Sequence, residues 1–77
     1  IMKENDNYEI SLITNYSDNI IFKVYNVTGQ SLISKKVYYQ DNKYTYNLDM
    51  SYANPGVYMV RMGNNTIGYK VGKIIVN

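Results

Sequence analysis

The chain has 77 residues, a formal net charge of +2, no Cys and no His. This length suits one small domain with a thin core. Without Cys the chain can form neither disulfides nor thiolate metal sites, and without His it lacks the side chain that enzymes most often use as an acid or base. Acidic and basic residues are interspersed and form no basic stripe for nucleic acid, and no apolar run approaches the roughly 20 residues of a membrane span.

Almost every segment alternates apolar and polar residues with a period of two, and turn residues recur at short intervals. This pattern is typical of an all-β sandwich or barrel. The first strand is predicted over Tyr8–Thr14, a turn over Asn15–Asn19 and the second strand over Ile20–Asn26. The positions expected to be buried in these two strands are Tyr8, Ile10, Leu12, Ile20, Phe22 and Val24.

The stretch YNVTGQSL predicts a hairpin turn. Asn26 favours the first position of a type I turn, and Gly29 supplies the positive φ that closes such a hairpin with a bulge. The third strand is predicted over Gln30–Tyr38, with Leu32 pointing inward. The SKK stretch within it marks an edge strand, because charges on an edge discourage unwanted pairing.

Three more strands complete the predicted fold, over Lys43–Leu48, Val57–Met62 and Ile67–Val76. The stretch DMSYANPG carries the chain from one sheet to the other, since Pro55 and Gly56 allow a sharp re-entry. Tyr44, Tyr46 and Leu48 share one face of their strand, and the same holds for Tyr58, Val60 and Met62.

The last strand combines two interior glycines with an aliphatic end. Gly68 and Gly72 leave its register open, because glycine weakens strand pairing or marks a bulge. The continuous apolar run from Ile74 to Val76 fits a strand that is covered on both faces. One face is expected to meet the core, and the other needs a partner or remains exposed.

No group of side chains predicts catalysis. The acidic residues are scattered over turns and strand faces, and GNNTIG lacks the lysine of a phosphate loop. The acidic stretches at Glu4–Asp6 and around Asp18 lack the ligand spacing of a calcium loop. Arg61 is expected on the outward face of its strand, solvated at the surface. The sequence therefore predicts no catalytic, metal or cofactor-binding residue, and no enzyme.

Three blocks of sequence together resemble the type A C-terminal sorting domain of the bacterial type IX secretion system. Its pattern is Y-x-x-x-G-Q, then D-x-S, then G-x-Y-x-V, and finally a lysine followed by aliphatic residues. The matching residues are Tyr25, Gly29, Gln30, Asp49, Ser51, Gly56, Tyr58, Val60, Lys73, Ile74, Ile75 and Val76. The Pro-Asn-Pro block that usually opens the family is absent between Ile1 and Tyr8.

The resemblance implies a small immunoglobulin-like antiparallel β-sandwich of about six or seven strands that is not an enzyme. Residues 8–77 would be the sorting domain, and residues 1–7 a linker or trimmed N-terminal segment. The implied partners are the type IX translocon, its outer-membrane shuttle barrel and a sortase-like peptidase that joins the cargo to the surface. The cargo would pass through the periplasm to the outer-membrane surface or the extracellular space.

If the chain is such a sorting domain, we expect Lys73, Ile74, Ile75 and Val76 to form the element that the translocon recognises. Gly29, Gln30, Asp49, Gly56 and Tyr58 are expected to be structural motif residues, with the Tyr58 hydroxyl on a backbone partner at a sheet corner. A competing interpretation is that the terminal residues only close the sheet. Two further alternatives are a structural spacer and an adhesive or carbohydrate-binding sandwich that stacks sugars on Tyr25, Tyr38, Tyr39 and Tyr69.

Overall fold

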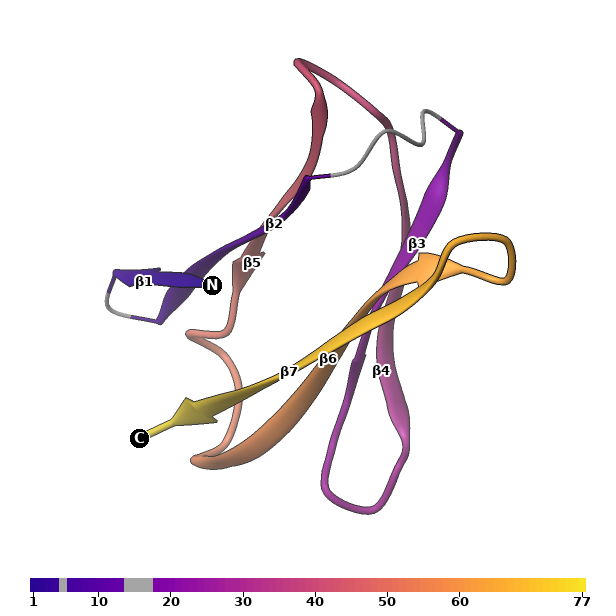
Figure 1. The fold of residues 1–77 in the computed structure, drawn as a ribbon. Helices are drawn as coiled ribbons and strands as arrows, with labels where there is room; N and C mark the ends of the chain where they lie inside the picture. Colours follow the sequence, from indigo (N-terminus) through magenta and orange to yellow (C-terminus); the bar gives the residue numbers. More distant parts are fainter. Residues whose placement is uncertain (5, 14–17) are drawn as a thin grey trace.

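The computed structural model describes residues 1–4, 6–13 and 18–77 (Figure 1). These residues form seven strands: β1 (Met2–Glu4), β2 (Asn7–Ile13), β3 (Ile20–Tyr25), β4 (Ser31–Val37), β5 (Lys43–Asp49), β6 (Gly56–Asn64) and β7 (Gly68–Val76). They pair antiparallel in a three-stranded sheet, β1-β2-β5, and a four-stranded sheet, β4-β3-β6-β7. The prediction of an all-β sandwich is confirmed.

The core consists of side chains that alternate along the strands and point from each sheet toward the other. Because successive residues of a strand face opposite sides, one face of each sheet is apolar and meets the other sheet. Phe22 of β3 stacks on Tyr46 of β5 with ring centroids 4.3 Å apart, which joins the two sheets directly. The buried hydrophobic residues of this core are Tyr8, Ile10, Ile20, Phe22, Val24, Val37, Tyr44, Leu48, Met50, Tyr58, Val60, Met62, Ile74 and Val76. The burial predicted for the second strand and for Tyr8 and Ile10 is confirmed, while Leu12 is partly buried against this core.

The turn between β3 and β4 has the predicted form. Gly29 adopts a φ of 85°, and its N–H donates to the carbonyl oxygen of Asn26 over 3.0 Å. The Asn26 side-chain oxygen accepts hydrogen bonds from the backbone N–H groups of Thr28 and Gln30. Asn26 therefore stabilises the reversal with its own side chain, as expected for asparagine in turns.

The inward position predicted for Leu32 is wrong. The register shifts between Val24, which pairs with Ile33, and Tyr25, which pairs with Ser31. Leu32 is the extra residue of this bulge and is 45% exposed, whereas Ile33 packs against the core. A bulge places two residues of one strand opposite one of its partner, so it reverses the face on which the following residues lie.

Residues at the N-terminal end of the chain take part in the fold. Strand β1 lies within residues 1–7 and pairs with β2 from Met2↔Glu9 to Glu4↔Asn7. The boundary at residue 8 stays a prediction. The turn predicted over Asn15–Asn19 falls largely on residues outside the described part of the chain.

Candidate recognition site

The β6–β7 hairpin holds the strand in which the recognition element was predicted. Strand β7 is an edge strand of the four-stranded sheet and pairs with β6 from Gly56↔Val76 to Asn64↔Gly68. This settles the register that the two glycines left open. The continuous pairing explains how the final strand is held in place, because each of its residues lies opposite a residue of β6.

The residues from Lys73 to Val76 alternate between the core and the surface. Ile74 and Val76 are buried, while Lys73 is exposed and Ile75 is 51% exposed. One face of this run therefore meets the core, as expected, and within the domain the other face is exposed, which is one of the two outcomes that the sequence left open. A two-layer sandwich covers only one face of each sheet, so the outward residues of β7 face away from the core.

A side chain from the other sheet caps the outer edge of β7. The Tyr8 hydroxyl, from β2, donates to the carbonyl oxygen of Ile75 at 2.9 Å. In an antiparallel strand, both backbone groups of one residue point to the same side, and alternate residues share that side. The backbone groups of Ile75, Lys73 and Val71 therefore point to the outer edge of β7, where Tyr8 occupies one carbonyl.

Gly63 and Gly68 allow the backbones of β6 and β7 to approach each other closely next to their turn. Gly63 is buried with a φ of 148°, and a Cβ built on it would lie 2.0 Å from the carbonyl oxygen of Gly68. No other residue type fits at this position without moving the backbone. Sequence reasoning missed Gly63 as a positioning residue and treated it as part of a turn.

The predicted structural motif residues lie in three separate places: beside β7, in the β3–β4 turn and, for Asp49, at the end of β5. Gly56 pairs with Val76, and Tyr58 pairs with Ile74, so both lie directly beside the terminal residues. The ring of Tyr58 is buried and its hydroxyl donates to the carbonyl oxygen of Asn54 at 2.7 Å, as predicted. Gly29 and Gln30 belong to the β3–β4 turn and contribute to the fold there.

Asp49 stabilises the start of the connection from β5 to β6. The backbone N–H of Ser51 donates to its carboxylate at 2.9 Å. This hydrogen bond, followed by one from the Ser51 side chain, lowers the pKa of Asp49 below its usual value of 3.8, against a smaller opposing effect of desolvation. The ionised carboxylate is thus the form that holds this turn.

Arg61 lies on the outward face of β6, as predicted, but it is partly buried between two aromatic rings. Its guanidinium carbon lies 4.2 Å from the ring centroid of Tyr69 and 5.5 Å from that of Tyr25. Both distances fall within the range of cation–π attraction. Among the described residues, the Arg61 Nε–H is buried and finds no hydrogen-bond acceptor.

The stacking face proposed for sugars does not form. Tyr25 and Tyr69 contact Arg61, whereas Tyr39 packs against the core, edge-on to Tyr44, with ring centroids 5.2 Å apart. Four tyrosines divided in this way offer no single platform. The carbohydrate-binding alternative has no support in this arrangement.

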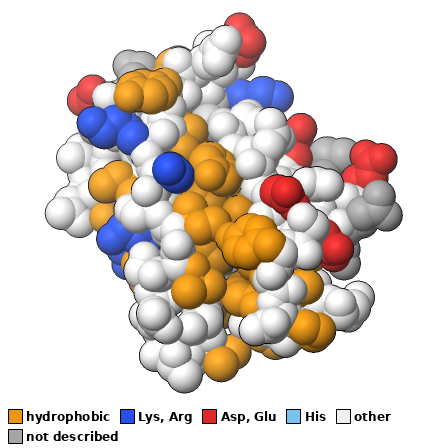
Figure 2. All heavy atoms as spheres, turned by 180° about the vertical axis from the view of Figure 1, so that it is seen from behind, with side chains coloured by type: hydrophobic (Ala, Val, Ile, Leu, Met, Phe, Trp, Pro, Cys, Tyr) orange, Lys and Arg blue, Asp and Glu red, His pale blue; other side chains and the backbone are white. Residues whose placement is uncertain are grey.

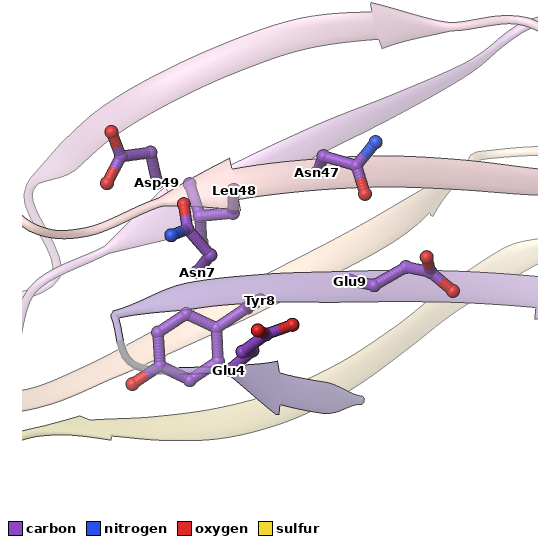
Figure 3. Close-up of a pocket in the computed structure, with 7 residues that line it drawn as sticks. All are labelled: Glu4, Asn7, Tyr8, Glu9, Asn47, Leu48 and Asp49. Carbon is purple, nitrogen blue, oxygen red and sulfur yellow. The ribbon is translucent and has the colours of Figure 1, made fainter.

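An open groove lies on the three-stranded sheet. Figure 3 shows its lining side chains, which come from β1, β2 and β5: Glu4, Asn7, Tyr8, Glu9, Asn47, Leu48 and Asp49. Within the described residues, no cluster of three or more His, Cys, Asp or Glu side chains is placed to hold a metal ion. The two acidic stretches considered for calcium fall partly outside those residues.

Comparisons with known proteins identify the family. The family model for the secretion system C-terminal sorting domain matches residues 4–77. No curated protein and no solved structure gave a significant match. The part of the chain that the structure describes contains no helix long and apolar enough to cross a membrane. With a match over nearly its whole length, the chain belongs to the family of secretion system C-terminal sorting domains.

Proposed function

We propose that the type IX machinery reads this domain through the outward side of strand β7, with Lys73 and Ile75 as the contacting side chains and Ile74 and Val76 as their anchors. The domain is a C-terminal sorting signal for type IX secretion and directs its cargo toward the outer membrane or cell surface. Sorting by this signal implies contact with the type IX secretion machinery. The family is one of secretion signals, not of catalysts.

The observation that carries the proposal is the alternation within the terminal run. Burial of Ile74 and Val76 fixes the strand on the core, and this leaves Lys73 and Ile75 presented on the opposite face. A partner can therefore bind the exposed side chains of a strand that is already folded. Recognition of an ordered strand avoids the entropy cost of folding it upon binding.

The backbone edge of β7 supports a contribution from strand addition. In that mode, main-chain hydrogen bonds give affinity, and alternate side chains give selectivity. The backbone groups of Val71 and Lys73 point to the outer edge, while the Tyr8 hydroxyl already occupies the carbonyl oxygen of Ile75. An added strand would thus pair with Val71 and Lys73 and would end before Ile75, because the Tyr8 hydroxyl occupies the Ile75 carbonyl oxygen.

For the partners, we propose the translocon and its outer-membrane shuttle barrel as the receptors, followed by a sortase-like peptidase that removes the domain and joins the cargo to the surface. The proposed route crosses the periplasm. The family assignment and the absence of Cys support this route, because the folded domain needs no disulfide chemistry in that compartment.

The test is export of a fluorescent reporter that carries residues 1–77 at its C-terminus, in a bacterium with a type IX system. The double variant Lys73→Ser/Ile75→Ser removes the exposed side chains and keeps both anchors. The matched control is Ile13→Ser/Lys43→Ser, an exposed Ile and Lys that pair with each other on the other sheet.

We expect the first variant to lose most of its export and the control to keep it, with both domains folded by circular dichroism. Equal export of the two variants would refute recognition through Lys73 and Ile75. A shortened reporter that lacks residues 73–77 provides the broader comparison, because it removes anchors and contacts together.

A further inference from the structure

The four-stranded sheet carries only basic charges, whereas the three-stranded sheet carries both signs. Strands β3, β4, β6 and β7, which the structure describes completely, contain no Asp or Glu. Seen from behind, most basic side chains lie on the left of the molecule and most acidic ones on the right, with hydrophobic side chains between them (Figure 2). The basic residues on these four strands are Lys23, Lys35, Lys36, Arg61, Lys70 and Lys73.

The strand registers place four of these cations on the outward face of the four-stranded sheet, here called the basic face. Lys36 pairs with Ile21, Lys23 with Arg61, and Lys73 with Met59. Paired residues point to the same side of a sheet, and Arg61 and Lys73 alternate with the buried residues of their strands. The cations of the basic face are Lys23, Lys36, Arg61 and Lys73.

The four strands that form this face contain no carboxylate that could neutralise the positive charge at its centre. Lys23 and Arg61 lie directly opposite each other, and like charges in this position destabilise a sheet. Arg61 is held by the rings of Tyr25 and Tyr69, which leave its charge in place. A negative group that reaches this face would remove the repulsion.

Apolar side chains alternate with the cations across the same face. Val57 is 37% exposed, Met59 36% and Val71 62%, and Ile75 continues this surface along β7. An exposed apolar surface that surrounds charged groups is typical of a protein interface. Because Lys73 and Ile75 belong to the basic face, it is continuous with the recognition residues proposed above.

We infer that the whole basic face, and not β7 alone, docks on a protein partner that presents carboxylates between apolar side chains. This inference rests on the proposed sorting function and names the chemistry of its receptor. Cations and apolar residues share the rows Lys36–Ile21, Lys23–Arg61–Val71 and Met59–Lys73, and this mixture fits a protein surface. A membrane-binding surface instead gathers apolar residues on one side and cations at the headgroup level.

The test uses cations of the basic face that are outside β7. In the reporter fused to residues 1–77, the variant Lys23→Glu/Lys36→Glu reverses two charges and leaves Lys73 and Ile75 intact. The matched control is Lys35→Glu/Lys43→Glu, which makes the same change in net charge. Lys35 is adjacent to Lys36 on β4 but pairs with Phe22, on the other side of the sheet.

We expect Lys23→Glu/Lys36→Glu to lower export by about tenfold or more, because like charges across an interface strongly oppose association. The control and the charge-conserving variant Lys23→Arg/Lys36→Arg should export normally, and circular dichroism should show all three folded. Normal export of the reversed variant, while Lys73→Ser/Ile75→Ser is still blocked, would overturn this inference and leave the sorting function standing.

A second measurement separates a protein partner from a lipid one. The purified chain is sedimented with vesicles of phosphatidylcholine and phosphatidylglycerol in equal parts, with and without the Lys23→Glu/Lys36→Glu change. We expect no binding to these vesicles. Binding that the charge reversal abolishes would assign the basic face to an anionic membrane and overturn the inference of a carboxylate-bearing protein.

Discussion

Replacing Gly63 by Ala tests the geometry that brings β7 against β6. A Cβ at this position would lie 2.0 Å from the carbonyl oxygen of Gly68 and 2.9 Å from the Cα of Tyr69. Both are backbone atoms, so no side-chain rotation relieves the contact. Since real Cβ contacts essentially never fall below 3.0 Å, the Cβ and the carbonyl oxygen of Gly68 would have to move apart by about 1 Å.

Two effects set the size of the loss. Forcing extra atoms into a packed site costs about 1–3 kcal/mol. The φ of 148° at Gly63 is rarely adopted by L side chains, and such backbone strain costs about 1–3 kcal/mol more. Together these approach the roughly 3–5 kcal/mol that the core of a domain this small supplies.

The matched comparison is Gly29→Ala, in the β3–β4 turn. Gly29 also has a positive φ, 85°, but a Cβ there meets no atom within 4 Å. Its cost is therefore the conformational penalty alone, about 1 kcal/mol. The two variants thus separate backbone strain from steric contact.

Thermal unfolding followed by circular dichroism provides the assay. We expect Gly29→Ala to lower the Tm by about 4–8 °C, the shift that 1 kcal/mol produces in a domain of this size. Gly63→Ala should lower the Tm by at least twice as much or abolish folding. Equal Tm values for the two variants would refute the close approach of Gly63 to the backbone of Gly68.

Two further changes probe the neighbouring contacts. Tyr8→Phe keeps the buried ring but removes the hydrogen bond to Ile75. The change should therefore destabilise the fold by about 1 kcal/mol and speed amide hydrogen exchange at the end of β7. Unchanged amide exchange at that end would contradict a capping role of Tyr8. Asp49→Asn removes a carboxylate whose pKa is lowered in the folded state. Because the pKa of Asp49 is lower in the folded state, its carboxylate stabilises the fold at pH values above the unfolded pKa of 3.8, and this contribution is lost as the pH falls through the folded pKa. The variant should therefore show a smaller drop in Tm than the parent on acidification below pH 3.8. Parallel acid profiles of variant and parent would disprove that contribution.

Local features of the fold could be predicted because they depend on neighbouring residues. The period-two alternation placed Phe22 and Val24 in the core, and the Asn26 to Gly29 turn has its predicted hydrogen bond and positive φ. The motif residues also pointed to the sorting family, which the match over residues 4–77 confirms. For the core and the turn, the informative residues lie within a few positions of one another, and the family pattern consists of short blocks whose order can be followed along the chain.

Features that depend on distant pairing could not be predicted in the same way. Leu32 was expected inside, but a bulge against β3 turned it outward, and only the pairing of two strands creates a bulge. The cradle of Arg61 requires Tyr25 and Tyr69, which are brought together by the order of β3, β6 and β7 in the sheet.

The sequence by itself predicted the strands β2 to β7, the turn at Asn26 to Gly29, most of the alternating core and the family of this domain, but not strand β1. Only the tertiary structure decided that Ile75 faces outward beside Lys73, that Tyr8 caps the edge of β7, and that the cations of distant strands share one face. The physical reason is that the strand pleat fixes which residues share a side, whereas sheet order and layer contacts determine which of the two sides is covered.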